Sequence, residues 1–256
     1  MPTARLNGIE VYYEDHGHGV PVLLTHGYAA SSRMWQPQIP ALSARYRLIL
    51  WDMRGHGQTD SPPRQEDYSE AATVEDMRQL LQHLDIEQAV IGGLSLGGYM
   101  SLAFHLAHSR MVRALILCDT GPGYRNDQAR AQWNENAYRR AKAFEEQGLA
   151  ALGQSAEVQA ARASHRSAAG LAMAARGMLA QFDARVINSL ESIRVPTLLI
   201  VGERDTPFLN ATDYMANKIP GARKVVIADA GHAANIDQPE AFNQAVLSFL
   251  DEVTHA

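Results

Sequence analysis

The stretch Gly92-Gly93-Leu94-Ser95-Leu96-Gly97-Gly98 decides how the rest of the sequence is interpreted. A short apolar run ends at residue 92 and a helical pattern begins at residue 96, so the chain must turn sharply at Ser95. Gly93 and Gly97 stand two residues before and after it, where a side chain would clash with the turn. The first N–H groups of the following helix are free, and that of Leu96 can point at an oxyanion. The stretch therefore predicts that Ser95 is a nucleophile.

Two other functions of a glycine-rich turn do not fit this spacing. A dinucleotide-binding turn needs glycine where Leu94 stands, and a phosphate-binding loop needs a Gly-Lys pair before a serine or threonine. A purely structural turn is the remaining alternative to a nucleophile.

Apolar runs on both sides of this turn predict a sheet. Runs at 20–25, 45–51, 88–92, 112–118, 196–202 and 224–228 have the length of buried strands, and 3–6 with 9–14 forms a hairpin around Asn7-Gly8. Helical spacing covers 73–84, 96–108 and the segment that Pro239 opens, and Thr73 with Asp76 resembles a capping box. The alternation predicts an α/β fold: a mostly parallel sheet with helices on both faces.

The alternation stops between residues 118 and 196, where only helical patterns occur. We expect the core to comprise residues 1–120 and 191–256, with a helical cap inserted at 121–190. Because ligands bind at the C-terminal edge of open α/β sheets, we expect the cap to cover that edge. An ordinary helical subdomain with no lid role is the alternative. Trp133, Met178 and Phe182 are candidate substrate-binding residues in the cap, although core packing would explain each of them equally well.

A serine hydroxyl needs a base and an orienting acid to become a nucleophile. His232 lies between the last strand and the last helix, and Asp205 lies just past the strand at 196–202. The order serine, aspartate, histidine is the one found when a G-x-S-x-G turn carries the nucleophile. Asp119 is the rival acid, because it also ends a strand. Helix capping is the alternative role for Asp205, and helix capping or simple burial for His232.

The segment His26-Gly27-Tyr28 follows the strand at 20–25. We expect the Tyr28 N–H to form the oxyanion hole together with the Leu96 N–H. The Tyr28 side chain is a candidate substrate-binding group, whereas His26 is interpreted as structural. Residues 52–57 gather charged groups and glycines, and we interpret them as a structural loop.

Bulk properties narrow the function further. The net charge of −5 over 256 residues, without a basic run, argues against nucleic-acid binding. Apolar runs far shorter than about 20 residues, and a start without a signal core, predict no membrane association and a cytoplasmic protein. Cys118 is the only cysteine, so no internal disulfide can form, and we expect it to be buried. The spacing of His26, Asp52 and His56 matches no metal motif, so no metal is expected.

Taken together, these pieces resemble the α/β-hydrolase superfamily over nearly the whole chain. They are His26-Gly27, Arg54-Gly55-His56-Gly57, the turn at 93–97, the segment 202–205 and Gly231-His232. The chain looks most like the small carboxylesterases, enol-lactonases and perhydrolases, and residues 174–185 resemble an enol-lactonase cap. The resemblance implies a Ser95–Asp205–His232 triad, an acyl-enzyme and no cofactor. Ser95 stands where haloalkane dehalogenases and epoxide hydrolases carry aspartate, so these two activities are not expected.

The sequence thus predicts a serine hydrolase that cleaves a carboxylic ester or lactone of a small molecule with an apolar part. Carbon–carbon bond hydrolysis or acyl transfer by the same residues is an alternative. A ligand receptor with slow turnover is another. No residue can be assigned from the sequence to binding a substrate carboxylate, which weakens a specific enol-lactonase assignment.

Overall fold

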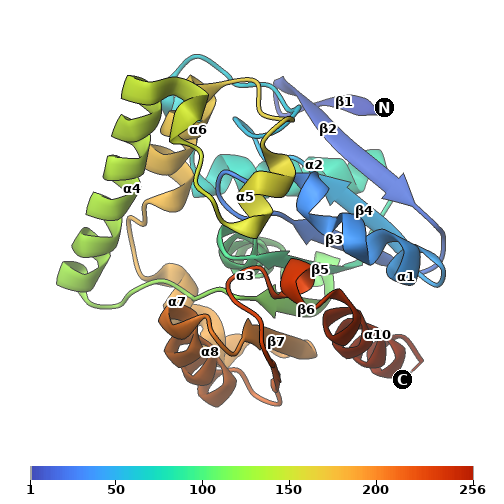
Figure 1. The fold of residues 1–256 in the computed structure, drawn as a ribbon. Coiled ribbons are helices and arrows are strands. Elements are labelled where there is room, and N and C mark those ends of the chain that lie inside the picture. The colour runs from blue at the N-terminus through green and yellow to red at the C-terminus, as the bar shows by residue number, and fades with distance from the viewer. Residues whose placement is uncertain (1, 256) are drawn as a thin grey trace.

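One eight-stranded sheet organises the protein, seen in a computed structural model that describes residues 2–255 (Figure 1). The strands are β1 (Thr3–Leu6), β2 (Ile9–His16), β3 (Pro21–Thr25), β4 (Arg47–Trp51), β5 (Ala89–Leu94), β6 (Val112–Cys118), β7 (Thr197–Gly202) and β8 (Arg223–Ile227). Their order across the sheet is β1-β2-β4-β3-β5-β6-β7-β8. Pairing is antiparallel from β1 to β2 and from β2 to β4, and parallel elsewhere. The predicted fold class is confirmed.

The antiparallel part of the sheet starts with a tight hairpin. Leu6 pairs with Ile9, and the two turn residues Asn7 and Gly8 have φ values of 46° and 84°. Both central residues of this turn type need positive φ, which asparagine and glycine tolerate best. The predicted hairpin is confirmed.

Helices cover both faces of the sheet because side chains alternate along each strand. The core helices are α1 (Ile39–Ser43), α2 (Glu70–His83), α3 (Leu96–His108), α8 (Thr206–Lys218), α9 (Ala234–Asp237) and α10 (Pro239–His255), with 3₁₀ turns η1 (Ser32–Gln38), η2 (Gln65–Asp67) and η3 (Ser109–Met111). Ile91 and Leu115 belong to the hydrophobic cluster of α2 and α3. Val90 and Ile116 belong to the opposite cluster, with α1 and α10.

The start of α2 differs from the sequence prediction. The helix begins at Glu70, and Ser69 is its N-cap, with a side chain that accepts a hydrogen bond from Ala72 N–H. The predicted capping box of Thr73 and Asp76 is therefore wrong. Both residues lie within the helix rather than at its start, and both are buried. Thr73 donates a hydrogen bond to the Ser69 carbonyl, and Asp76 pairs with an arginine.

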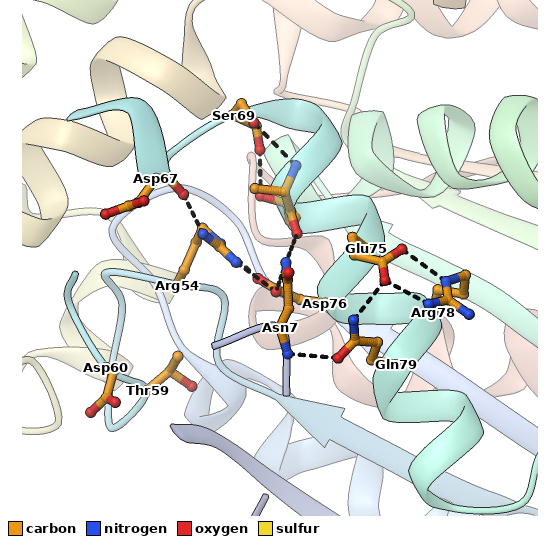
Figure 2. A network of polar contacts seen from close by, with 12 residues as sticks. Asn7, Arg54, Thr59, Asp60, Asp67, Ser69, Glu75, Asp76, Arg78 and Gln79 are labelled. Atoms are coloured by element: carbon orange, nitrogen blue, oxygen red, sulfur yellow. Dashed lines mark hydrogen bonds and ion pairs between the residues drawn. The ribbon is translucent and has the colours of Figure 1, made fainter. Parts of the chain in front are cut away.

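That arginine, Arg54, ties the loop after β4 to two other elements (Figure 2). Its Nη2 lies 2.6 Å from Asp76 Oδ1, and Asn7 Nδ2 from the hairpin turn donates to the same oxygen at 2.9 Å. Both charged groups are buried. Burial raises the pKa of Asp76, and the Arg54 guanidinium opposes that rise. Residues 52–57 thus form a structural loop, as their sequence indicated.

Residues 119–196, between β6 and β7, form helices and loops without a strand. They include α4 (Asp127–Gln147), η4 (Gly148–Ala151), α5 (Ala156–Ala161), α6 (Ala168–Ala174), the π-helical turn η5 (Ala175–Leu179), α7 (Arg185–Ser189) and η6 (Leu190–Ser192). The long helix α4 packs beside α6 at one side of the molecule (Figure 1). In residues 2–255, no helix is long and apolar enough to cross a membrane.

Glycines lie where residues 119–196 contact the rest of the protein most closely. A Cβ on Gly177 would lie 1.9 Å from the Tyr68 carbonyl oxygen, and one on Gly170 would lie 3.0 Å from Gly55 Cα. Real Cβ atoms do not approach backbone so closely, so only glycine fits at Gly177 without movement. Bare backbone therefore allows η5 and α6 to approach the loops of the core closely.

Candidate active site

Ser95 occupies a strained turn between β5 and α3. Its φ of 55° and ψ of −116° lie outside the regions that side chains favour. Two hydrogen bonds from the neighbouring strand hold the turn: Ser95 N–H donates to the Cys118 carbonyl at 2.9 Å, and Thr120 Oγ1 donates to the Ser95 carbonyl at 2.6 Å. The strain is thus maintained by surrounding contacts.

The two glycines beside Ser95 are required by space. A Cβ on Gly93 would lie 2.5 Å from the Gly97 carbonyl carbon, and one on Gly97 would lie 2.2 Å from the Thr25 carbonyl oxygen. A side chain on Gly93 would push β5 away from α3, and one on Gly97 would push α3 away from the end of β3. The sequence pattern around the serine thus reflects real crowding in the turn.

His232 and Asp205 are joined by a hydrogen bond. His232 Nδ1 lies 2.8 Å from Asp205 Oδ2, and the Asp205 side chain is only 5% exposed. Although Asp205 precedes α8, its carboxylate caps no N–H of that helix in the described chain. The Phe208 ring stacks on the imidazole at 5.0 Å between centroids. With Nδ1 facing Asp205, the Nε2 atom is left to exchange a proton.

Asp119 lies deeper than Asp205. Its Oδ1 accepts a hydrogen bond from Gly202 N–H at 2.7 Å, and the residue is fully buried. Burial, together with the charge of the adjoining Asp205 carboxylate, raises the pKa of Asp119 well above its usual range. Its other carboxylate oxygen, Oδ2, has no hydrogen-bond partner among residues 2–255. The aspartate that hydrogen-bonds to the histidine is Asp205, whereas Asp119 accepts from the backbone of β7.

The predicted oxyanion loop passes directly beside the serine. A Cβ on Gly27 would lie 3.6 Å from Ser95 Cβ, so the Tyr28 backbone follows next to the turn. His26 fixes the loop: its Nδ1 donates to the Gly27 carbonyl at 2.7 Å and its Nε2 accepts from Met53 N–H at 2.9 Å. Burial lowers the pKa of His26 to about 3, so the ring is neutral, with one donor and one acceptor.

A second buried histidine supports the same loop from the helical insertion. His165 Nε2 donates to the Ala29 carbonyl at 2.9 Å, while Gly57 N–H donates to His165 Nδ1 at 3.1 Å. Burial lowers the pKa of His165. Sequence reasoning missed this residue, because a histidine in an alanine-rich segment carries no spacing signal of its own.

Two cavities meet at Ser95. The larger, of about 710 Å³, is the polar chamber, and it is also lined by Tyr28, Arg140, Asp205 and His232. The smaller, of about 370 Å³, is the apolar chamber; its walls are mainly aromatic and aliphatic. Both chambers share a partition made of Trp133, Leu179, Pro207 and Phe208.

Two of the four candidate substrate-binding residues line the chambers, and two do not. Trp133 lines both chambers and Tyr28 lines the polar one. Met178 is buried in the core and Phe182 is 66% exposed, and neither lines the two chambers. These two residues were predicted from their apolar character within the insertion, and that character does not show which way a side chain faces. Gln181, which sequence reasoning missed, faces the apolar chamber.

Comparison with known proteins finds hydrolases of one fold family. Residues 20–239 match the model of the alpha/beta hydrolase fold. A protein of Azorhizobium caulinodans, described as a proposed carbamate hydrolase, is 31% identical over 99% of both chains. The 3-oxoadipate enol-lactonase 1 of Acinetobacter baylyi is 30% identical over 91% of this chain and 89% of its own. A solved esterase from Thermogutta terrifontis, with malate bound, is 30% identical over 99% of both chains, with a TM-score of 0.85.

Proposed function

Because the chain belongs to the alpha/beta hydrolase fold family, we propose that it cleaves a carboxylic ester or lactone through an acyl-enzyme on Ser95. The observation that carries the proposal is the 2.8 Å hydrogen bond from His232 Nδ1 to Asp205 Oδ2, beside a chamber that Ser95 also lines. The chain is a hydrolase, and its similarity to an esterase and an enol-lactonase supports this narrower substrate class.

The first half of the reaction forms the acyl-enzyme. Ser95 Oγ attacks the acyl carbonyl carbon while His232 Nε2 accepts the hydroxyl proton. The carbonyl oxygen becomes an oxyanion, which accepts hydrogen bonds from the N–H groups of Tyr28 and Leu96. Asp205 holds the imidazole in the required tautomer and stabilises its positive charge.

The second half regenerates the enzyme. The bond to the alcohol oxygen breaks, and His232 donates its proton to that oxygen. A water molecule then loses a proton to His232 and attacks the acyl carbon. The bond from that carbon to Ser95 Oγ breaks and His232 returns the proton to Oγ, which releases the acid and restores Ser95.

Hydrolysis of p-nitrophenyl esters of increasing acyl length tests the proposal, with Ser95→Ala and His232→Ala as variants. We expect release of p-nitrophenol by the wild type and a loss of at least about 10⁴-fold in each variant. A fluorophosphonate that reacts covalently with activated serines should label Ser95, and peptide mass spectrometry locates the adduct.

Two results would contradict the proposal. Activity that survives in Ser95→Ala would mean that another group is the nucleophile. Labelling absent from the wild type, together with no hydrolysis of any ester or lactone, would mean that Ser95 is not activated. Exposed Ser192→Ala is the matched control, since it removes a hydroxyl outside both chambers.

A further inference from the structure

The turn that carries the proposed oxyanion donor, the Tyr28 N–H, is strained. Ala30 N–H donates to the Gly27 carbonyl at 3.2 Å, which closes a turn over residues 27–30. Ala29, the third residue of this turn, has a φ of 57°, a conformation that glycine or asparagine adopts more readily than alanine. Such a backbone persists only where the surrounding structure holds it. The contacts around Ala29 therefore decide whether the turn keeps its shape.

The Ala29 carbonyl is held by a histidine of the helical insertion, residues 119–196. His165 Nε2 donates to this carbonyl at 2.9 Å, and Gly57 N–H donates to His165 Nδ1 at 3.1 Å. Because Nδ1 accepts from an N–H, the ring proton must be on Nε2. The loop after β4 thus imposes the tautomer that serves Ala29. His165 is 7% exposed and lines neither chamber, so it acts on the turn and not on a substrate.

The same stretch of the insertion also holds the Tyr28 side chain. Tyr28 Oη donates to the Leu171 carbonyl at 2.9 Å, and the tyrosine is buried. Its ring meets His56 edge-on with 5.6 Å between centroids, and Phe144 of α4 at 6.3 Å. Tyr28 is therefore fixed at its own side chain and, one residue further along the chain, at the Ala29 carbonyl.

Residues 165–171 are themselves anchored. Ser167 is the N-cap of α6, and its Oγ accepts from Gly170 N–H at 2.9 Å. Gly170 lies against the loop after β4, since a Cβ there would be 3.0 Å from Gly55 Cα. The stretch thus contacts that loop and the turn at 27–30 together, and it can hold the one relative to the other.

Resting on the proposed function, we propose that residues 165–171 position the oxyanion hole, with His165 as the positioning residue. Without the hydrogen bond to Ala29, the turn relaxes toward a backbone that alanine favours, and the Tyr28 N–H no longer points at the oxyanion. Complete loss of one oxyanion donor slows turnover by about 10²–10³-fold, so a misplaced donor should cost about 10–100-fold. The insertion thereby takes part in the reaction without touching the reacting atoms.

Two substitutions of His165 separate this role from a purely structural one. The amide N–H₂ of His165→Gln can occupy the place of Nε2 and donate to Ala29. The amide oxygen of His165→Asn can instead occupy the place of Nδ1 and accept from Gly57 N–H. Each variant loses one of the two hydrogen bonds. In hydrolysis of p-nitrophenyl esters, kcat and kcat/KM should fall together by about 10–100-fold in His165→Asn and by less than about threefold in His165→Gln.

An oxyanion mimic gives a readout that a structural role would not move. An alkyl trifluoromethyl ketone bonds through its carbonyl carbon to Ser95 Oγ, His232 takes the hydroxyl proton, and the ketone oxygen becomes an oxyanion. Its affinity should fall with kcat in His165→Asn and be retained in His165→Gln. Tyr28→Phe keeps His165 and removes the bond to the Leu171 carbonyl, so its kcat should fall by about threefold with KM unchanged. Crystal structures of the variants report the Ala29 φ without turnover.

The two hypotheses fail in different ways. Equal kcat in His165→Gln and His165→Asn would overturn the positioning role, whether both are active or both follow a loss of stability in urea denaturation. An Ala29 φ that stays near 57° in His165→Asn would also overturn it. Ester hydrolysis that survives in Ser95→Ala would overturn the proposed reaction. The crystal structures would still report in that case whether His165 holds the turn.

Discussion

At the scale of single residues, the hydrogen bond between His232 and Asp205 gives the sharpest expectation. Asp205→Asn keeps the shape of the side chain but offers an N–H to Nδ1, which leaves the imidazole in the wrong tautomer. Turnover of a p-nitrophenyl ester should fall by about 10⁴-fold. Asp119→Asn is the matched control. The asparagine oxygen can still accept from Gly202 N–H, and the hydrogen bond between His232 and Asp205 is left intact, so the loss should be far smaller. A severe loss in Asp119→Asn with a mild one in Asp205→Asn would reverse the roles.

The backbone of Ser95 permits a second prediction, about stability. Its φ of 55° strains any residue that carries a Cβ, by roughly 1–3 kcal/mol, whereas glycine tolerates this φ but loses up to about 1 kcal/mol in entropy. Ser95→Gly should therefore unfold with a free energy about 1 kcal/mol higher than Ser95→Ala, measured by urea denaturation. A Ser95→Gly protein less stable than Ser95→Ala would show that the turn stores no such strain.

At the scale of elements, the contact between η5 and the Tyr68 carbonyl leaves no room for a side chain at Gly177. Gly177→Ala would place a methyl group 1.9 Å from a backbone oxygen, so η5 must move. We expect a loss of about 2 kcal/mol in the free energy of unfolding. Gly153→Ala is the control within the same insertion, because a Cβ there meets nothing within 4 Å and its stability should be unchanged or slightly higher. Equal effects of the two substitutions would show that the contact is not tight.

The elements also show what a sequence can and cannot reveal. The strand at Val112–Cys118 and the helix at Leu96–His108 were predicted to the residue, because strand-length apolar runs and a strong helical period leave few alternatives. The start of α2 was misplaced because Thr73 and Asp76 imitate a cap while their side chains serve tertiary contacts. The place of Gln181 in a chamber wall could not be predicted, since it depends on where an extended segment lies against α4. Motif order and strand ends predicted that His232 and Asp205 lie close together, and the fold does bring them within hydrogen-bond distance.

At the scale of the whole molecule, the buried neutral histidines link folding to pH. A histidine in an unfolded chain takes up its proton near pH 6.5, whereas His26 in the folded protein stays neutral down to about pH 3. The unfolded chain therefore binds more protons between these values. The contribution of His26 to stability is full above pH 6.5 and is lost as the pH falls.

This linkage can be measured as a difference between variants. Between pH 7.5 and pH 5, the free energy of unfolding of the wild type should fall by about 2 kcal/mol more than that of His26→Gln. The comparison is necessary because buried Asp52, Asp76 and Asp119 have raised pKa values, which act in the opposite direction in both proteins. His18→Gln, at an exposed position, should follow the wild type. Parallel pH curves for wild type and His26→Gln would contradict the expectation.

The two chambers that meet at Ser95 have a consequence for steady-state kinetics. If the alcohol departs through one chamber while the acyl group stays in the other, the acyl-enzyme is the same species whichever alcohol the ester carried. Esters with a common acyl group and different alcohols should then share one maximal rate whenever deacylation is slowest. An added nucleophile that enters the polar chamber should divide that shared intermediate between transfer and hydrolysis in a fixed ratio, whichever ester supplied it.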